Sequence, residues 1–257
     1  MINLNSRQSE IYHMVKERSV MKVRDIISLF DVSAATIRKD LTLLEESGLL
    51  RRTHGEVHAI APNGLQMTPF EARSFLCIEA KRKIAQAAVQ QINDGESIIL
   101  DSGSTTAEIA KLLVDRKNLT VITNSLPVAL ALSSSAVTVI IVGGMFLGQN
   151  ISIQGPDAEA FLQQIEADKA FISATGVRNN IGLTASNPLE ASIKKCMIHA
   201  AHKVYAVLDS SKFSIGSINL FADFSEIDTL ITEALPDDPS LTQRFDALGT
   251  QIIFADS

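Results

Sequence analysis

The sequence predicts an α/β protein in two parts, a small N-terminal helical domain with a β-hairpin and a larger domain built on a sheet. Two observations lead to this prediction. Residues 23–49 carry apolar side chains at helical spacing in two short segments, and from residue 94 onward short apolar strands alternate with helices. Such alternation is typical of a mostly parallel sheet that helices cover on both faces.

The composition limits the class of protein further. The chain of 257 residues has a formal net charge of −6, and 46% of its residues are hydrophobic, which is ample for two cores. Two cysteines are too few for a disulfide framework, and neither a transmembrane run nor a signal peptide is recognisable. We therefore expect a cytoplasmic protein with no membrane partner.

Charge is distributed unevenly between the two parts. Residues 1–58 hold nine Lys and Arg against eight Asp and Glu, whereas residues 59–257 hold 14 against 21. Basic side chains that cluster in a small domain suit one DNA-facing edge, and an acidic remainder would keep DNA away from the second domain.

Three helices are predicted in the N-terminal domain. Asn5 or Ser6 caps a first helix that ends near Arg18. A second helix follows over residues 23–30. The third begins after Ser33, whose hydroxyl can accept the free N–H groups of the next turn, and Gly48 ends it.

The third helix has the pattern of a recognition helix. Ile37, Leu41 and Leu44 form its buried stripe, so small and basic side chains face outward. A helix, a short turn and a second helix of this kind form the helix-turn-helix motif. The predicted DNA-binding residues of this segment are Ser33, Ala35, Thr36, Arg38, Lys39 and Thr42.

A hairpin is predicted directly after the recognition helix, with Gly55 near its turn. It would make the motif a winged one and end the domain at residue 59. The alternative for its two arginines is that Asp40 or Glu45 holds one of them within the domain. The residues predicted to meet DNA phosphates are Arg51, Arg52, Thr53 and His54.

The motifs V-S-x-x-T-I-R-K-D-L, L-E-x-x-G and R-x-H-G resemble the N-terminal domain of DeoR-type bacterial transcriptional regulators. Glu56 stands where that family usually has a second glycine. The resemblance implies sequence-specific binding to double-stranded operator DNA.

A linker is predicted over residues 60–74, around Ala61–Gly64, and the second domain over residues 75–257. One long helix is expected from Phe70 to Ile92, with Lys81, Arg82 and Lys83 on a solvated face. Strands are expected at 97–100, 119–123, 137–142, 169–173, 204–208, 229–232 and 251–254, and helices at 104–113, 126–132, 157–164 and 188–200.

Small polar clusters follow four of these strands. Ligands of open α/β sheets bind outside the carboxyl ends of the strands. Glycine allows close backbone approach, and hydroxyls beside a helix N-terminus suit a phosphate or another anion. The predicted ligand residues are Asp101, Ser102, Gly103, Ser104, Thr105 and Thr106 at the first strand end, and Thr123, Asn124, Ser125, Gly143, Gly144, Asp209 and Lys212 at the other three.

The alternative for these positions is a role in turns and helix caps alone. The first cluster matches neither the Walker A loop nor the dinucleotide fingerprint, so no cofactor is expected. Glu190, Lys194 and Lys195 are assigned to a solvated helix surface. His199 and His202 are interpreted as helix-end residues, and no metal site is expected.

The motifs L-D-S-G-S-T-T, V-x-T-N-S, V-G-G, F-I-S-A-T-G-V and D-S-S-K-F also resemble the DeoR family. The resemblance implies a sensor domain similar in fold to pentose-phosphate isomerases and CoA transferases. It also implies a phosphorylated sugar as effector, a repressor role at a sugar or polyol operon, and a homodimer or homotetramer.

The competing hypothesis is a sugar-phosphate isomerase-like enzyme. Such an enzyme needs a carboxylate base. Asp101, Asp209 and Glu190 are candidates, but no motif pairs them, and the K-G-x-G-G-type loop of those isomerases is absent. A regulator that is not an enzyme is therefore the preferred interpretation.

Overall fold

The computed structural model describes residues 4–18, 20–46, 49–53, 55–59, 70–178 and 181–255. The chain separates into two compact units, Met1–Leu76 and Cys77–Ser257. The predicted linker around Ala61–Gly64 and the predicted cap Gly48 lie outside the described residues. Within the described ranges, no helix is both long enough and apolar enough to cross a bilayer.

Three helices of the first unit enclose an apolar core: α1 (Ser6–Arg18), α2 (Val23–Leu29) and α3 (Ala34–Glu46). Asn5 Oδ1 accepts the Gln8 backbone N–H at 3.0 Å, and Gln8 Oε1 accepts the Asn5 N–H at 2.9 Å. This reciprocal pair is a capping box and fixes where α1 begins. Ser33 Oγ accepts the Thr36 N–H at 3.2 Å, which confirms the predicted cap of α3.

An antiparallel sheet in the order β1-β3-β2 completes the first unit. Its strands are β1 (Val20–Lys22), β2 (Leu50–Thr53) and β3 (Glu56–Ala59). The predicted hairpin is β2–β3, and Gly55 in its turn has a φ of +79°, which glycine adopts without strain. The sequence did not indicate β1, because three residues are too few to show alternation.

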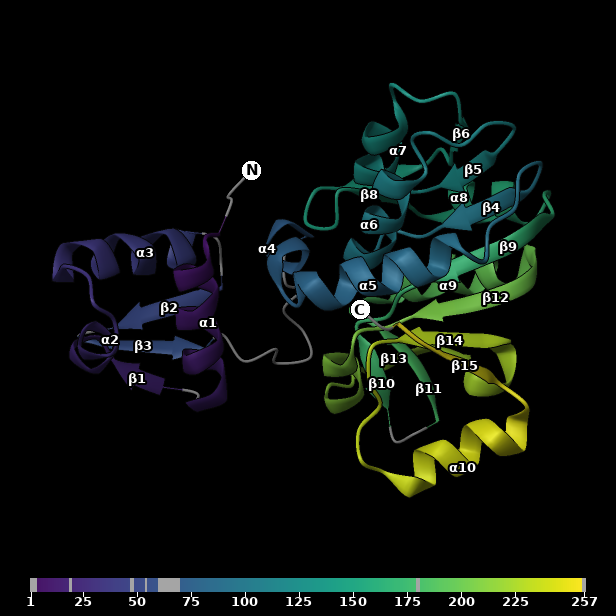
Figure 1. The fold of residues 1–257 in the computed structure, drawn as a ribbon. Helices are drawn as coiled ribbons and strands as arrows, with labels where there is room; N and C mark the ends of the chain where they lie inside the picture. The colour runs from purple at the N-terminus through teal and green to yellow at the C-terminus, as the bar shows by residue number, and fades with distance from the viewer. Residues whose placement is uncertain are drawn as a thin grey trace. The chain divides into compact units, whose positions relative to one another are not determined.

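Seven parallel strands form the main sheet of the second unit (Figure 1). In sequence order they are β4 (Ser97–Leu100), β5 (Thr120–Thr123), β6 (Thr138–Ile141), β9 (Ala167–Ile172), β12 (Ala201–Val207), β14 (Thr229–Thr232) and β15 (Gln251–Phe254). In space they run β15-β14-β12-β9-β4-β5-β6. The chain first moves from β4 to β6 and then returns to β9 on the other side of β4, so the winding direction reverses between β4 and β9.

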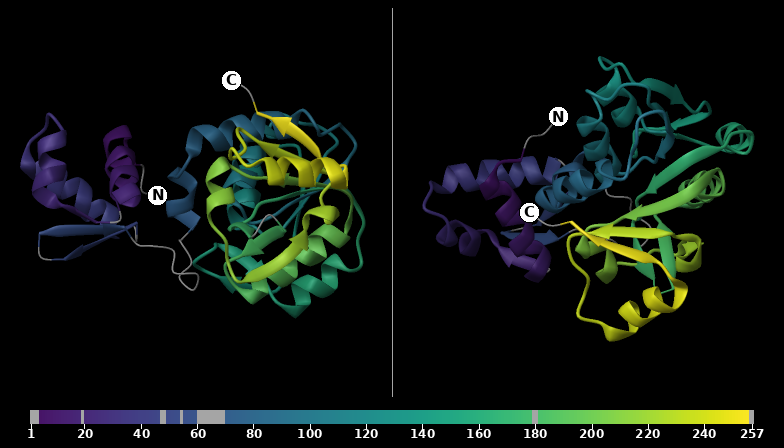
Figure 2. Two further views of the ribbon diagram at one scale, coloured as in Figure 1. Left: turned by 90° about the horizontal axis from the view of Figure 1, so that it is seen from below. Right: turned by 45° about the vertical axis from the view of Figure 1, so that its right-hand side comes forward.

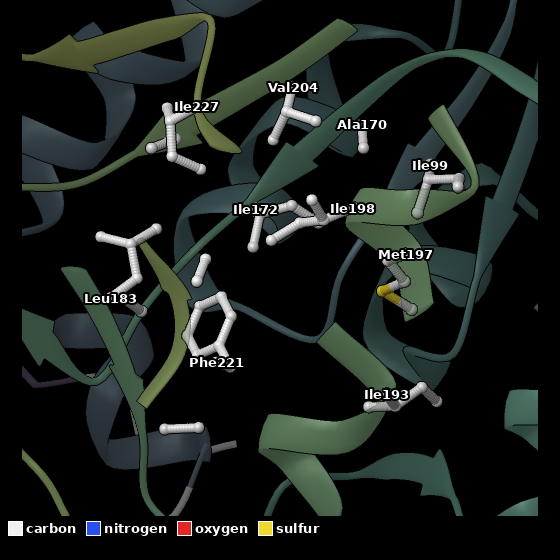
Figure 3. Packing of buried hydrophobic residues seen from close by; sticks show 14 of the residues in the cluster. Ile99, Ala170, Ile172, Leu183, Ile193, Met197, Ile198, Val204, Phe221 and Ile227 are labelled. Atoms are coloured by element: carbon white, nitrogen blue, oxygen red, sulfur yellow. The ribbon is translucent and has the colours of Figure 1, made fainter. Parts of the chain in front are cut away.

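Helices cover both faces of this sheet, as predicted (Figure 2). Right-handed crossovers put the helices of the two winding directions on opposite faces. The two layers are α5 (Ile78–Val89), α6 (Ser104–Leu112) and α7 (Leu126–Leu132) on one face, and α8 (Pro156–Leu162), α9 (Pro188–His199) and α10 (Pro239–Leu248) on the other. Figure 3 shows part of the core, where Ile193, Met197 and Ile198 of α9 belong to one apolar cluster with Ile172 and Val204 of the sheet.

Two small antiparallel sheets accompany the main one. β7 (Met145–Leu147) pairs with β8 (Ser152–Gln154), and a second sheet has the order β10-β11-β13. Its strands are β10 (Gly176–Arg178), β11 (Gly182–Ala185) and β13 (Asn219–Asp223), and two short 3-10 helices are η1 (Ser210–Ser214) and η2 (Phe224–Glu226). These strands of three to five residues were not predicted, and neither was α10.

The prediction of a single long helix from Phe70 to Ile92 is wrong. Two helices, α4 (Phe70–Phe75) and α5, occupy that segment, and Cys77 between them has φ +51° and ψ +37°. A residue in the left-handed region cannot continue the hydrogen-bonding of a right-handed helix. The periodicity of the apolar residues gave no sign of this break.

Gly176→Ala tests how closely β10 approaches the loop after η1. A Cβ on Gly176 would lie 2.5 Å from the Ile215 carbonyl carbon, whereas one on Gly148 would meet nothing within 4 Å. We expect Gly176→Ala to lower the free energy of unfolding by about 1–3 kcal/mol, the usual cost of overpacking. The control Gly148→Ala should have little effect in thermal unfolding of the full chain, and equal losses in the two variants would contradict the packing described.

Candidate functional site

The outer face of α3 carries the residues that the sequence assigned to DNA. Ile37, Leu41 and Leu44 are fully buried. Thr36 is half-buried and its hydroxyl lies 2.8 Å from that of Ser33. The predicted residues Ser33, Ala35, Arg38, Lys39 and Thr42 are exposed along α3 and its cap, and Glu45 and Glu46 are exposed at the end of the helix. The structure therefore brings the predicted residues together on one solvent-facing surface.

Arg52 of the wing joins this surface. Its Nη1 donates to Thr42 Oγ1 at 3.0 Å, so its guanidinium lies against the outer face of α3. Within the described residues, Glu45 accepts the backbone N–H of Arg52 at 2.9 Å, and Asp40 binds Arg7 at 2.7 Å and Gln8 at 2.6 Å. Neither carboxylate holds the Arg52 guanidinium, so the alternative from the sequence is wrong for Arg52, and it stays untested for Arg51.

The remaining wing residues are described in part. Thr53 is exposed, and its hydroxyl lies 2.8 Å from His58 Nε2. The side chain of Arg51 and the whole of His54 lie outside the described residues.

In the second unit, the predicted polar clusters lie at the carboxyl ends of the strands of the main sheet. Asp101 follows β4, Asn124 follows β5, Gly143 follows β6 and Asp209 follows β12. Because the strands are parallel, their carboxyl ends lie on the same side of the sheet, so these positions lie on that side as well. The first cluster lies at the reversal between β4 and β9, which is where ligands bind in open sheets of this kind.

Asp101 is fully buried and organises the loop between β4 and α6. Its Oδ1 accepts the Gly103 N–H at 3.0 Å and the Thr106 hydroxyl at 2.9 Å, and its Oδ2 accepts the Ser173 N–H and hydroxyl, each at 2.8 Å. A Cβ on Gly103 would lie 2.6 Å from Ser173 Cβ. Glycine is therefore required for the close approach of this loop to the end of β9.

Lys194 completes this network, and its assignment to a solvated surface is wrong. Only 1% of Lys194 is exposed, and its ammonium forms an ion pair with Asp101 and donates to the Ser173 carbonyl at 3.0 Å. Glu190 is also buried, with Oε1 3.9 Å from Lys194 Nζ and Oε2 accepting the Ser186 hydroxyl at 2.5 Å. Of the three residues on α9 that were expected in solvent, Lys195 alone is exposed.

The charge of Asp101 is set by two opposing effects. Burial raises the pKa of this carboxyl, but the Lys194 ammonium and the Ser173 donors favour the ionised form more strongly, so the pKa is lowered below its ordinary value. Asp101 is consequently a paired anion in the folded protein.

The start of α6 offers unused hydrogen-bond donors. Thr106 is occupied by Asp101 and the Gly103 carbonyl. Among the described residues, no side chain caps α6 and no partner is found for the side chains of Ser102, Ser104 and Thr105. Hydroxyls and free N–H groups at a helix N-terminus form a binding site for an anion.

The second predicted cluster is mostly committed to the fold. Thr123 Oγ1 donates to the Leu100 carbonyl at 2.6 Å, and Ser125 caps α7 by accepting the Val128 N–H at 3.4 Å. Asn124 Nδ2 donates to the Ile153 carbonyl at 2.9 Å, but its buried Oδ1 has no partner among the described residues. One acceptor of this cluster is therefore free to meet a ligand.

Gly143 and Gly144 form the turn between β6 and β7, directly after the predicted strand. Gly144 has a φ of +139°, which side chains rarely adopt, and a Cβ there would lie 2.9 Å from the Gln154 carbonyl. Gly143 is exposed and open.

Asp209 and Lys212 form the fourth cluster, at the end of β12. The Ser211 hydroxyl donates to Asp209, and Lys212 Nζ lies 4.0 Å from Asp209 Oδ2. Burial raises the pKa of Asp209, but Lys212 and then Lys81 more than offset this, so the pKa is lowered.

Lys81 of α5 was expected on a solvated face, and this is wrong. It is 1% exposed and shares a stripe with Ile84, Ala85 and Ala88. The helical spacing of these residues could be seen in the sequence, but the charge of Lys81 led to its assignment to the solvated face. Arg82, by contrast, is exposed and pairs with Glu79 at 2.8 Å.

His199 ends α9, as predicted, whereas His202 lies within β12. In the part of the chain that the structure describes, no three His, Cys, Asp or Glu side chains are placed to hold a metal ion.

A winged helix-turn-helix unit joined to an α/β unit defines a DNA-binding regulator with a second, separate domain. Residues 7–63 match the family model of the DeoR-like helix-turn-helix domain, and residues 76–234 match that of the DeoR C terminal sensor domain. The chain belongs to the DeoR family of transcriptional regulators.

Named relatives agree with this assignment. "Transcriptional repressor AccR" of Agrobacterium fabrum is 34% identical over 89% of each chain, and "HTH-type transcriptional regulator IolR" of Bacillus subtilis is 34% identical over 90% of this chain and 92% of its own. The "L-fucose operon activator" of Haemophilus influenzae is 34% identical over 91% of this chain and 94% of its own.

Solved structures resemble the chain more distantly. A D-ribose-5-phosphate isomerase in complex with phospho-erythronic acid has a TM-score of 0.40 and 20% identity over 53% of this chain and 54% of its own. eIF2B delta from Chaetomium thermophilum has a TM-score of 0.45 and 15% identity over 87% of this chain and 70% of its own. Scores this low carry no inference about function.

Lys194→Met should lower the free energy of unfolding at neutral pH by about 3–5 kcal/mol, because it leaves Asp101 as a buried charge without its partner. The control Lys195→Met changes an exposed neighbour and should cost less than about 0.5 kcal/mol. Urea unfolding of the full chain measures both, and equal effects would contradict the buried pair.

The same experiment has a pH signature. The pKa of Asp101 is lowered by folding, so its ionisation stabilises the wild type above the ordinary Asp value of about 3.9, and this contribution is lost as pH falls through the folded value. In Lys194→Met, burial without the ammonium raises the pKa of Asp101 instead, so the difference between the two proteins should shrink as pH is lowered toward and below about 4. A difference that does not change with pH would count against the ion pair as its cause.

Proposed function

We propose that the protein represses an operon of sugar or polyol catabolism and that a phosphorylated sugar, bound at the strand ends, changes its affinity for operator DNA. The names of its relatives support this, since they include a "Putative aga operon transcriptional repressor" of Escherichia coli that is 33% identical over 91% of this chain. A protein that binds chromosomal operators works in the cytoplasm.

The observation that carries the ligand proposal is the unused set of donors at the start of α6. Ser104 and Thr105 are buried below the surface yet have no side-chain partner in the described part of the chain. They lie at the reversal of the sheet, and the helix N-terminus adds its positive end. A phosphate would satisfy all of these donors together.

Other strand ends would complete the site. The free Oδ1 of Asn124 can accept a hydrogen bond from a sugar hydroxyl, and Lys212 supplies a positive charge. Gly143 and Gly144 leave room beside the adjoining strand. We assign Asp101 and Thr123 to positioning these groups, since each is fully occupied within the protein.

An isomerase is the less favoured candidate. A general base must reach its substrate and accept a proton. Asp101 and Glu190 are buried in contact with Lys194, and the lowered pKa of Asp101 makes it a weak base. These contacts support a protein that binds a sugar phosphate without transforming it.

The DNA proposal needs more than one copy of the chain. One helix-turn-helix unit reads a single half-site, and specific operators are read by dimers with two half-sites at a fixed spacing. We therefore propose a homodimer or homotetramer on double-stranded operator DNA.

Arg38→Ala tests the recognition surface. If Arg38 reads a guanine, the substitution should weaken binding to the specific operator by about 1–3 kcal/mol and random DNA much less. The exposed Arg82 of α5 provides a control, because Arg82→Ala should leave both affinities unchanged. Fluorescence anisotropy with the two DNAs measures the difference. Equal losses on both would make Arg38 a phosphate contact, and no loss would remove it from the interface.

The double variant Ser104→Ala, Lys212→Ala tests the effector site. In the wild type, the active sugar phosphate should change operator affinity by a coupling of about 1–3 kcal/mol. The variant should still bind operator but ignore the sugar. Ser134→Ala with Lys117→Ala, two exposed positions away from the strand ends, should respond normally. A double variant with an unchanged response would place the pocket elsewhere.

A further inference from the structure

One long segment of the second unit carries no charge at all. Residues 118–156 contain no Asp, Glu, Lys, Arg or His over 39 consecutive positions, although 20% of the chain is charged. The segment includes β5, α7, β6, β7 and β8. The rest of the unit, by contrast, is strongly acidic, with 13 Lys and Arg against 20 Asp and Glu over residues 77–257.

Large apolar side chains of this segment are exposed. Leu130 of α7 is 71% exposed, Ile141 of β6 is 46% exposed and Phe146 of β7 is 54% exposed. Ile140 and Met145 are exposed beside them in the chain, and α7 contacts β6. We call Leu130, Ile140, Ile141, Met145 and Phe146 the apolar edge. Exposed apolar side chains concentrated on one uncharged edge strand and on the segments next to it in the chain are typical of an interaction site.

The backbone of β6 is also available. Among the described strands, β6 pairs with β5 alone. The N–H groups of Thr138 and Val142 point toward β5 and donate to the carbonyls of Leu119 and Thr123, at 3.0 and 2.9 Å. Because N–H and C=O groups alternate in direction along a strand, those of Val139 and Ile141 point to the open side. Natural edge strands are usually protected by charged side chains, and this one has none.

We propose that the apolar edge binds the same edge of a second copy of this chain, with the two β6 strands antiparallel about a two-fold axis. A two-fold interface joins identical patches, so it must be self-complementary. An uncharged edge meets this condition, because two copies of an acidic unit would repel one another over most other surfaces. Val139 and Ile141 would exchange their free backbone hydrogen bonds, and the exposed apolar side chains would be buried.

The opposite edge of the sheet provides a contrast. Phe254 of β15 is 51% exposed, which is close to the exposed fraction of Ile141. However, α10 packs on β15 and carries Arg244 and Asp246, so this edge lies beside charge. Phe254 therefore gives a matched control for a substitution in β6.

The proposal gives an interface to the proposed oligomer, and the test is the self-association of the full chain without DNA or sugar. An oligomer that Ile141→Lys leaves intact overturns this interface alone, whereas a monomeric wild type also overturns the proposed homodimer or homotetramer. Sedimentation equilibrium should show the wild type at twice 27.8 kDa or more. Ile141→Lys should raise the dissociation constant by at least about tenfold, because it puts an unpaired charge into the interface. Phe254→Lys should leave it unchanged.

Hydrogen exchange gives a second measurement on the unaltered protein. The Val139 and Ile141 amides should be protected in concentrated samples and exchange faster on dilution, whereas edge amides of β15 should not change. A monomeric wild type, an oligomer that Ile141→Lys leaves intact, equal effects of the two variants, or β6 amides that ignore dilution would each overturn the proposal.

Discussion

The buried ion pair between Lys194 and Asp101 is the interaction on which the proposed ligand site depends. It joins α9 to the loop after β4 across 93 positions of sequence, and Ser173 at the end of β9 takes part in it. A lysine ammonium without a carboxylate, or the reverse, would be very costly at this depth. Each charge therefore requires the other in place, and together they hold the two strands at which the sheet reverses.

This pair also positions the groups proposed to meet the ligand. Asp101 binds Gly103 and Thr106, so it fixes the first turn of α6. The donors of Ser104 and Thr105 follow from that turn. The same carboxylate would otherwise be an obvious candidate for a catalytic base, but it is committed to Lys194.

Much of this could be predicted from the sequence, because the signals were local. The stripe of Ile37, Leu41 and Leu44 and the cap at Ser33 define α3 within 12 positions, and strand ends followed by Gly and Ser mark the edge of a parallel sheet. The polar interior could not be predicted in this way. Lys194 and Lys81 lie on apolar stripes, but a lysine is rarely buried without a partner. Lys194 pairs with Asp101, which follows a strand distant in sequence, and Lys81 acts on the charge of Asp209, which follows another.

Cys77 has a consequence for how a signal could leave the sheet unit. A continuous helix acts as a stiff rod and carries rotation from one end to the other. The left-handed backbone at Cys77 interrupts that rod between α4 and α5. The hydrogen bonding of α5 is therefore not continuous with that of α4, so a rotation of α5 would not reach α4 through one unbroken helix. Natural variation here should favour residues that tolerate the dihedral angles, such as glycine or asparagine, over residues that merely match the thiol in size.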